Sequence, residues 1–568
     1  MKRDPYTRRS FIKKTAMAAG AGLGIPWLTS CANPASATMR VASGRSIAAG
    51  PYQPTWDSFS AGYRCPDWFR DAKFGMWAHW TAQCVPEQGD WYARNMYIQG
   101  HPQYKHHAGT YGHPSQAGFM EVDNLWKAEE WEPEKLMALY KRAGAKYFFA
   151  LANHHDNFDA YDSAHHPWNS VNVGPRRDIV GTWARVAREN GLRFGVTNHS
   201  SHAWHWLQTA YNYDPEGPLA GQRYDAYRLT KADGAGKWWE GLDPMDLYTG
   251  RNMVMPDGVT SIEAAKKFNQ TTTWLENPPP QNPEFVENWF LRCQDLIDKY
   301  HPDVLYFDDT GLPLGQTGLD IAAHYYNASL KWNGGRMEVV LNSKLMPAEV
   351  RSALVEDIER GASGELRPAS WQTDTCIGSW HYERSLFENH TYKTTGQVTG
   401  MLVDIVSKNG NLMLNIPLRG NGAVDADELA FLAGMERWIA VNGEGIYGTR
   451  PWVAFGEGPS VTGAQVAGKF GGVSDVRPYT SDDVRYTTKG DSLYAFVMAW
   501  PGSGRATLRK LSTQSPELAG RRVTGVTLLG YPGEIGWAQA EDGLRVRLPA
   551  GAPSEHATAL KISGVTAS

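Results

Sequence analysis

Apolar and polar residues alternate along the chain in a regular order of short strands and longer helices. Apolar runs between polar turns predict strands at residues 73–80, 145–152, 192–197, 304–307, 339–341, 354–358 and 412–416. Apolar residues that return every three or four positions predict helices at residues 131–143, 178–190 and 398–407. This order favours a parallel α/β architecture, and a (β/α)8-like barrel fits its length. A doubly wound sheet remains open, because periodicity alone does not separate the two folds.

Two stretches depart from this alternation. Residues 201–280 are rich in Gly, Pro, Trp and Tyr and follow a predicted strand. A connection this long inside a compact domain usually has a function, and after a barrel strand it would lie on the face where active sites are built. Beyond Gly448 the pattern changes to short strands separated by Gly, Pro and Asp turns. These strands, at residues 483–488, 492–499, 523–529 and 544–548, predict a β-sandwich.

The patterns divide the 568 residues into four parts. We expect an export signal at 1–37, a linker at 38–55, a (β/α)8-like barrel domain at 56–447 and a C-terminal β-sandwich domain at 448–568. The linker is expected from its content of Ala, Ser, Gly and Pro. A chain of this length is too long for a single compact core, so two folded domains are the natural expectation.

The first residues have the pattern of a targeting signal. An arginine pair at 8–9 precedes an apolar run that ends near Trp27 and is too short to span a bilayer. This is typical of twin-arginine export. Residues 28–31 resemble a lipobox that would lipidate Cys31, whereas Ala-Ser-Ala at 35–37 offers a cleavage site that would release a soluble protein. Both outcomes predict an exported protein, either periplasmic or anchored at Cys31 to a bacterial envelope membrane.

Composition narrows the choice of partners. The chain carries 56 basic and 60 acidic residues, a net charge of −4, which gives no reason to expect nucleic acid or an anionic membrane surface. Its 23 Trp and 26 Tyr suit a protein that stacks rings on sugars, although core packing uses them as well. The five cysteines form no C-x-x-C pair, so no zinc cage or redox motif is predicted. Buried free thiols are expected, with a Cys65–Cys84 disulfide as the alternative.

Two predicted strands end in carboxyl groups. One ends at Asp308 and the other at Glu359, and in a barrel the carboxyl ends of the strands face the active-site mouth. A glycosidase needs one ionised and one protonated carboxyl group there. Asp308 and Glu359 form a candidate pair, with Glu356 as the alternative acid. A strand-end turn or a surface cluster with Arg351 and Arg360 would account for the same residues.

Histidines follow two other strands. His154 and His155 precede Asp156, and His79 ends the first strand. Neutral imidazoles could bind sugar hydroxyls, or the group could hold the metal of a metal-dependent hydrolase. Adjacent histidines differ from the i, i+2 spacing of ligands on a strand, and no third ligand is assigned. No metal or other cofactor is therefore predicted.

Several blocks resemble glycoside hydrolase family 29, the α-L-fucosidases. The resemblance extends over about residues 68–452. In order, the blocks are KFGMWAHW at 73–80 with DWY at 90–92, AGAKY at 143–147 with HHDNF at 154–158, LYFD at 305–308, SKNGNLMLNI at 407–416 and NGEGIYG at 442–448. Membership implies a retaining mechanism with Asp308 as nucleophile and a glutamic acid/base, which falls at Glu359 or Glu356.

The resemblance also implies which residues contact the sugar. These are His79, Asp90, Trp91, His154, His155, Asn198, Tyr306, Lys344 and Trp371. Several depart from the family pattern: Asp90 stands in place of Glu, Asn198 lies where a Tyr-containing strand is usual, and Lys344 lies in the region of an Arg. Trp371-Gln372-Thr373 replaces a WET-like segment. The departures leave the sugar open.

The expected function is that of a retaining exo-α-L-fucosidase, which removes terminal α-L-fucosyl residues from glycans through a covalent glycosyl-enzyme intermediate. The same mechanism on an L-galactose or L-glucose configured substrate is one alternative. A catalytically inactive carbohydrate-binding protein is another. In each case the partner is a carbohydrate.

Overall fold

The computed structural model describes residues 38–271, 275, 282–462, 466–469, 473–474 and 478–566. The expected export signal and Cys31 lie outside the described residues. No helix within the described ranges is long and apolar enough to cross a membrane. The cysteines at 65, 84, 293 and 376 are free thiols, which excludes the Cys65–Cys84 bond.

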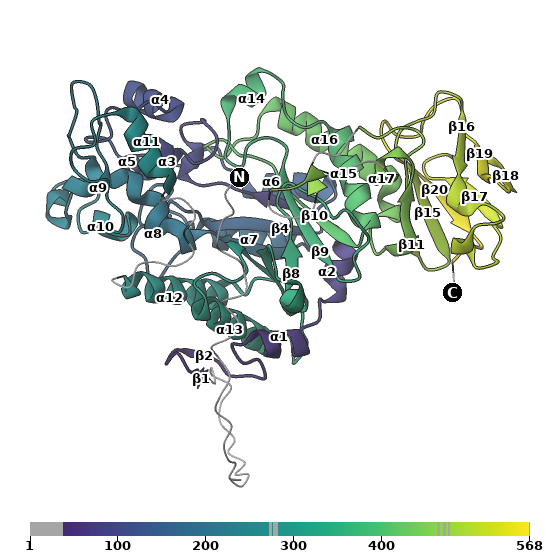
Figure 1. Cartoon of the computed structure of the whole chain (residues 1–568), viewed down its shortest axis with the longest axis horizontal. Helices are drawn as coiled ribbons and strands as arrows, with labels where there is room; N and C mark the ends of the chain where they lie inside the picture. Colours follow the sequence, from purple (N-terminus) through teal and green to yellow (C-terminus); the bar gives the residue numbers. More distant parts are fainter. Residues whose placement is uncertain are drawn as a thin grey trace, which may run out of the picture. The chain divides into compact units, whose positions relative to one another are not determined.

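Eight parallel strands close into a barrel, which confirms the predicted (β/α)8-like fold and excludes a doubly wound sheet (Figure 1). Around the barrel the strand order is β10-β3-β4-β5-β6-β7-β8-β9. The strands are β3 (Phe74–Ala78), β4 (Tyr147–Asn153), β5 (Arg193–Asn198), β6 (Val304–Thr310), β7 (Val340–Lys344), β8 (Val355–Asp357), β9 (Trp371–Cys376) and β10 (Gly410–Asn415). The first and last barrel strands pair directly, with Leu412 beside Phe74 and Asn415 beside Trp77.

Helices cover the outside of the barrel (Figure 1). The longer ones are α4 (Pro102–Thr110), α6 (Pro133–Arg142), α7 (Ile179–Glu189), α12 (Pro283–Tyr300), α13 (Gln316–Trp332), α15 (Thr395–Ser407) and α16 (Ala426–Asn442). Helix α7 is typical: Asp178 caps it by accepting from the Gly181 N–H at 2.8 Å. Its apolar face buries Val180, Ala184 and Ala187. Shorter helices are α1 (Trp56–Gly62), α2 (Asp67–Ala72), α3 (Tyr92–Asn95), α5 (Phe119–Leu125) and α14 (Arg384–Glu388).

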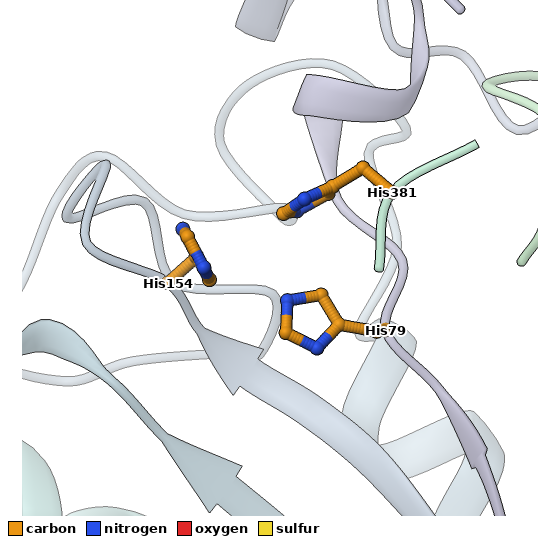
Figure 2. Close-up of side chains that lie close together, drawn as sticks. All are labelled: His79, His154 and His381. Carbon is orange, nitrogen blue, oxygen red and sulfur yellow. The ribbon is translucent and has the colours of Figure 1, made fainter. Parts of the chain in front are cut away.

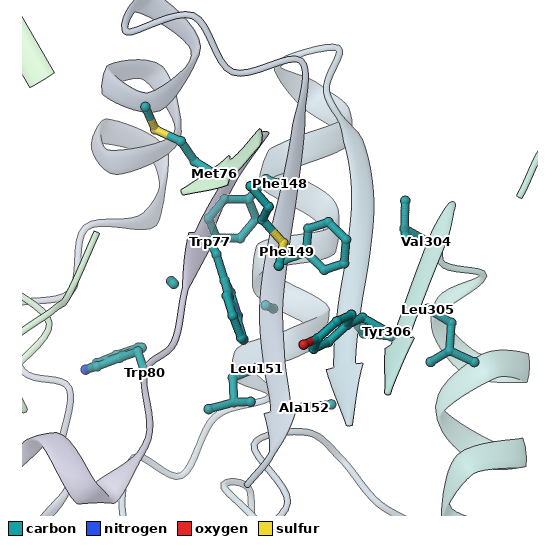
Figure 3. Close-up of a cluster of buried hydrophobic side chains, with 14 of the residues drawn as sticks. Met76, Trp77, Trp80, Phe148, Phe149, Leu151, Ala152, Val304, Leu305 and Tyr306 are labelled. Atoms are coloured by element: carbon teal, nitrogen blue, oxygen red, sulfur yellow. The ribbon is translucent and has the colours of Figure 1, made fainter. Parts of the chain in front are cut away.

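Aromatic side chains fill the barrel interior. The strands are buried on both faces, as parallel strands under helices are. Figure 3 shows Trp77 of β3 and Tyr306 of β6 among these interior side chains, with their ring centroids 6.0 Å apart. Part of the tryptophan content therefore serves the core.

The residues expected as a linker, 38–55, contain a small hairpin of β1 (Thr38–Arg40) and β2 (Ser46–Ala48). Its chain is tied to α13: Asn327 donates to the carbonyls of Ala48 and Tyr52, and the Ala48 N–H donates to His324. Buried side chains of α13 thus satisfy backbone groups of residues 38–55. These hydrogen bonds give the segment a fixed structure, which its composition does not predict.

The insertion at 201–280 is built largely of short helices. They are η2 (Ser200–His202), α8 (Ala203–Trp206), η3 (Leu207–Tyr211), α9 (Asp225–Arg228), η4 (Lys231–Gly234), α10 (Pro244–Leu247) and α11 (Ile262–Thr271). Trp206 packs edge-on against His154, 5.8 Å between centroids, and lies 5.5 Å from His155. Because both histidines follow β4, the insertion covers the carboxyl ends of the barrel strands.

The described C-terminal part consists mainly of β-strands, with the short helices α17 (Pro459–Thr462), η7 (Arg509–Leu511) and η8 (Pro516–Leu518) between them. One sheet of five strands has the order β11-β14-β15-β20-β17 and a second of three strands has the order β16-β19-β18. They are formed by β11 (Arg450–Glu457), β14 (Val484–Lys489), β15 (Ser492–Val497), β16 (Arg505–Leu508), β17 (Gly525–Leu528), β18 (Gly536–Ala540), β19 (Gly543–Arg547) and β20 (Thr558–Ser563). The inner faces of both sheets enclose one apolar cluster that includes Tyr486, Leu508, Leu544 and Ile562, as expected of a sandwich.

A buried ion cluster joins this part to the barrel. Asp404 of α15 accepts from Arg485 Nε of β14 at 2.6 Å and from Lys408 Nζ at 2.7 Å. All three side chains are nearly inaccessible. Burial alone would raise the pKa of Asp404, but the two cations outweigh it and lower that pKa.

Candidate active site

A cavity of about 90 Å³ opens where the barrel strands end. Residues at or beyond the carboxyl ends of β3, β4, β5, β6, β7, β8 and β9 reach it. Its lining consists of Trp77, His79, Trp91, His154, His155, His199, Asp308, Lys344, Glu359, Asp374, Trp380 and Lys469. This is the face on which (β/α)8 barrels build their active sites.

Lys344 lies between the two predicted carboxyl groups. Its Nζ donates to Glu359 Oε2 at 2.6 Å and also to Asp308 Oδ1. Because each oxygen is one hydrogen-bond length from the same nitrogen, the two oxygens lie within roughly 6 Å of each other. This bound excludes carboxyl groups on opposite ends of the barrel, and it includes the separation of about 5–5.5 Å that a nucleophile and an acid acting on one anomeric centre require.

Asp308 is held in its ionised form. Its second oxygen, Oδ2, lies 3.1 Å from His199 Nδ1 and 3.3 Å from His155 Nε2. Burial would raise the pKa of Asp308, but the Lys344 charge and the two histidines outweigh it and hold the pKa well below its usual value. An ionised carboxylate fixed on both oxygens is oriented for attack.

Glu359 is shifted in the opposite direction. Burial raises its pKa, and the negative charges of Asp374 and Asp308 oppose its ionisation further, against a lowering by Lys344. The two carboxyl groups that share one lysine therefore have pKa values driven apart. Such divergence marks an acid and a base or nucleophile in one site.

Glu356, the alternative acid, lies on the other side of its strand. It contacts Arg351 at 3.0 Å and Arg367 at 2.5 Å, and it accepts from the Met346 N–H. Strand alternation turns Asp357 to the inner face instead. There burial, together with Asp374, raises the pKa of Asp357. Glu356 is thus placed for a structural contact and not for the cavity.

A cluster of buried histidines forms the opposite wall (Figure 2). His79, His154 and His381 come from three separate segments and place ring nitrogens within 4.8 Å of one another. Burial, and then the neighbouring imidazoles, hold the pKa values of His79 and His154 well below the usual value. Burial also lowers the pKa of His199 to about 4. These rings are neutral at physiological pH, and each offers one donor and one acceptor.

His79 has particular significance because neither of its ring nitrogens has a hydrogen-bond partner among the described residues. Buried polar atoms without a partner are costly, so a ligand that supplies hydroxyl groups would relieve them. A sugar does this. A metal ion is a second occupant that the same nitrogen atoms would accept.

The structure brings most of the sequence-predicted residues together at the cavity. These are His79, Trp91, His154, His155, Asp308, Lys344 and Glu359. Asp90 acts from behind this wall: it accepts from the backbone N–H of His381 at 2.8 Å. Asp156, considered with the histidine pair, accepts from Gln83 at 2.8 Å outside the cavity lining.

Three further predicted residues do not reach the cavity. Asn198 turns outward and accepts from Trp289 Nε1 of α12. Trp371 lies at the amino end of β9, where its Nε1 donates to the Lys408 carbonyl. Tyr306 shares the inner face with Asp308 but lies one layer deeper, where its hydroxyl donates to Asp374 at 3.1 Å. These contacts are structural or position other residues.

Sequence reasoning missed several lining residues. They are Trp77, His199, Asp374, Trp380 and Lys469. His381, which was also missed, belongs to the histidine cluster but does not line the cavity. Strand alternation could have identified His199 and Asp374. Residues two positions apart in a strand share a face, so His199 follows Thr197 and Asp374 follows Gln372 on the inner face. Lys469 lies between β12 (Val466–Ala467) and β13 (Val473–Ser474), far along the chain, and nothing in the local sequence connects it to the strand ends.

Comparison with known proteins gives a consistent picture. A family model described as alpha-L-fucosidase matches residues 39–444, and one described as alpha-L-fucosidase C-terminal domain matches residues 477–563. A human tissue alpha-L-fucosidase is 25% identical over 90% of this chain and 92% of its own. An alpha-L-fucosidase of Branchiostoma floridae is 26% identical over 90% and 96%.

Among solved structures, one of a Thermotoga maritima alpha-fucosidase in complex with a mechanism-based inhibitor superimposes with a TM-score of 0.64. It is 24% identical, and the match covers 90% of this chain and 100% of that one. At this identity the likeness is one of fold.

Proposed function

Since the chain belongs to the alpha-L-fucosidase family of glycoside hydrolases, we propose that it is a retaining exo-enzyme that removes terminal α-L-fucosyl residues from glycans. The observation that carries the proposal is the contact of Lys344 with both Asp308 and Glu359. One cation between a carboxylate with a lowered pKa and a carboxyl group with a raised pKa supplies both reactants of the double displacement.

In the first step Asp308 attacks the anomeric carbon and forms an ester with the sugar. The bond to the glycosidic oxygen breaks, and Glu359 gives its proton to that oxygen, so the leaving group departs as an alcohol. In the second step the ionised Glu359 takes a proton from water, whose oxygen attacks the same carbon and releases Asp308. Two inversions give net retention.

The histidine wall binds the hydroxyl groups of the sugar. Neutral imidazoles at His79, His154 and His155 donate and accept without placing a charge beside the ring. Trp91 and Trp380 supply apolar faces for the carbon side of the sugar. The cavity is small, which suits one terminal residue and an exo mode of action.

The identity of the L-sugar depends on this wall. Lys344, a point charge, occupies the region of an Arg. Asp90 does not line the cavity and accepts from the His381 backbone N–H instead. L-galactose and L-glucose configured substrates differ from L-fucose at one or two positions, so both are competing substrates for the same mechanism. A protein that binds a sugar without turnover is the alternative of another class.

Export is part of the proposal. It rests on the arginine pair at 8–9 and the apolar run that follows. Mass spectrometry of the mature N-terminus distinguishes lipidation of Cys31 from cleavage after Ala37. An intact N-terminus on protein recovered from the cytosolic fraction would refute export.

The activity is tested with aryl α-L-fucoside, α-L-galactoside and α-L-glucoside, with the product anomer followed by proton NMR. We expect the α-L-fucoside to give the highest kcat/KM and the α-anomer to form first. Initial release of the β-anomer would refute retention, and the absence of turnover on all three would favour the binding protein. Turnover that falls with a strong chelator and returns with metal would favour the metal-dependent hydrolase.

A further inference from the structure

A second and larger cavity, of about 810 Å³, lies beside the catalytic one. We call it the junction cavity, because the barrel and the C-terminal sheets both line it. Its residues are Arg360, Thr375, Lys393, Thr394, Gly396, Gln397, Met401, Pro478, Tyr479, Met498, Ala499, Trp500, Glu555, His556 and Ala557. The histidine cluster and the carboxyl groups of the first cavity are not among them.

The junction cavity begins one side chain away from the catalytic cavity. Arg360 directly follows Glu359, and its left-handed backbone (φ 49°) turns the chain there. The Arg360 guanidinium lies over the ring of Trp380, 4.7 Å from the centroid. Trp380 lines the catalytic cavity, whereas Arg360 lines the junction cavity. A single cation–aromatic pair therefore forms the partition between them.

The proposed reaction indicates on which side of the catalytic cavity the leaving group departs. An acid must lie beside the glycosidic oxygen that it protonates, so the leaving group departs on the side of Glu359. A leaving group as large as a sugar would extend past Glu359 and contact Arg360. The junction cavity is therefore positioned to receive the part of the glycan that remains after the terminal sugar is removed.

Two cations face this cavity with little compensation. Lys393 donates to the Cys376 carbonyl at 2.7 Å, and no carboxylate among the described residues lies within 4 Å of its Nζ. Burial lowers the pKa of Lys393, and the nearby charge of Arg360 lowers it further. Arg360 itself approaches Asp90 only at 4.0 Å. The positive charges of Arg360 and Lys393 repel each other in one cavity, and an anion bound between them would reduce this repulsion.

The remaining titratable residues of the junction cavity do not fully cancel this charge. Glu555 pairs only loosely with Arg437, at 3.8 Å and in solvent, so it offsets one of the two positive charges of Arg360 and Lys393. Burial lowers the pKa of His556, which leaves that ring neutral at physiological pH. Tyr479 and Trp500 add aromatic faces of the kind that stack on pyranose rings. The lining thus combines net positive charge with aromatic surface.

We propose that the junction cavity binds a negatively charged sugar of the leaving group, a hexose that carries a sulfate ester or a carboxylate. This inference rests on the proposed function for the position of the leaving group, and it adds the class of glycan from which the terminal residue is removed. Lys393 and Arg360 bind the anionic group, and Trp500 or Tyr479 packs on the ring.

The test compares three fucosylated substrates that differ only in the leaving group: an aryl α-L-fucoside, a neutral fucosyl oligosaccharide, and the same oligosaccharide with a sulfate ester or with a uronate. For the wild-type protein we expect the charged oligosaccharides to have a KM about tenfold below the neutral one, a typical value for a charge-assisted hydrogen bond. The sulfate and uronate arms identify which anion is preferred.

Lys393→Gln should remove most of this preference while kcat on the aryl fucoside stays unchanged. Lys489→Gln is the matched control, because Lys489 also donates to a backbone carbonyl, that of Tyr447, but is exposed on β14. Trp500→Ala should raise KM for both oligosaccharides, charged and neutral. A variant that has lost stability is recognised by a fall in melting temperature and in aryl fucoside turnover.

Binding is also measured by calorimetry on Asp308→Asn, which needs no turnover. Equal affinity for the charged and neutral oligosaccharides, or an equal loss with all substrates in Lys393→Gln, would overturn the inference. Failure of the proposed function gives a different result, since the wild-type protein would then leave even the aryl fucoside intact.

Discussion

Two buried ion clusters in the barrel domain differ in the balance of their positive and negative charges. In the first, Arg292 of α12 donates through Nη2 and Nε to the two oxygens of Asp159, at 2.6 and 3.0 Å. Asn157 accepts from the remaining part of the guanidinium at 2.6 Å. One positive and one negative charge meet with matched geometry.

The second cluster is unbalanced. Lys344 contacts both Asp308 and Glu359, Asp374 adds a third carboxyl group to the same cavity, and Lys469 is a second lysine of its lining. The pKa of Asp308 is held well below its usual value, whereas burial raises the pKa of Glu359. A balanced buried pair fixes structure, whereas a surplus of acids around one cation forces their pKa values apart. The imbalance, and not burial itself, is what identifies a reactive site.

Of the substitutions that test this contrast between the two clusters, Asp308→Ala should have the largest effect. Loss of the proposed nucleophile should lower kcat by about a thousandfold or more, because in the proposed mechanism Asp308 is the carboxylate that forms the ester. Azide should restore part of the rate by attacking the sugar from the emptied position. The measurement is kcat with and without azide, with the melting temperature as a check on folding. A variant that keeps near wild-type turnover would remove Asp308 from the mechanism.

Arg292→Met should have the next largest effect, and on stability instead of chemistry. It leaves Asp159 buried without its partner, at a cost of about 3–5 kcal/mol in the free energy of unfolding. Chemical denaturation measures the loss, and kcat per folded molecule should change little. A stable Arg292→Met variant that has lost turnover would show that this pair serves the reaction and would end the contrast between the two clusters.

Glu359→Gln sharpens the comparison within the reactive cluster. Poor leaving groups need its proton, so their kcat/KM should fall by about a hundredfold or more. Activated aryl fucosides, which leave without protonation, should lose far less in the first step. Glu356→Gln serves as the control, because its side chain contacts Arg351 and Arg367. If the leaving-group dependence appears in Glu356→Gln instead, the acid is Glu356.

Lys344→Met should displace the pH profile. Activity requires ionised Asp308, which sets the acid limb, and protonated Glu359, which sets the alkaline limb. Lys344 lowers the pKa of both carboxyl groups, so its removal raises both. The pH optimum of kcat/KM should therefore move to higher pH by about one unit. Lys408→Met removes a buried lysine paired with Asp404 and should leave the optimum in place. A shift towards acid would contradict the electrostatic role of Lys344.

The barrel could be predicted because its outer-facing positions are apolar. Strand β9 was not predicted, because Trp371–Cys376 has four polar residues in a row, from Gln372 to Thr375, between its apolar ends. The inner Gln372 accepts from Tyr147 and donates to Asp357, while Asp374 reaches the cavity. A strand that faces a polar barrel mouth loses the hydropathy signal at the positions that carry the chemistry.

The same distinction between apolar and polar strands decided which site residues could be predicted. Asp308 and Glu359, which line the cavity, were selected from the sequence because each directly ends or follows an apolar strand. At β5 the prediction selected Asn198, whereas the next residue, His199, contacts Asp308. Alternation decides between such neighbours, because a shift of one residue exchanges the two faces. Contacts made across the sequence, such as that of Arg360 with Trp380, have no local signature at all.

The closure of the barrel has a consequence for its biosynthesis. The earliest barrel strand, β3, pairs with the last, β10, and the His79 N–H donates to Asn415 at 2.8 Å. While the ribosome is still translating the residues between them, β3 lacks one neighbour and its edge is open to unwanted pairing. Such long-range pairing folds slowly. In a nascent chain this edge of β3 therefore stays without its partner until residue 415 has emerged.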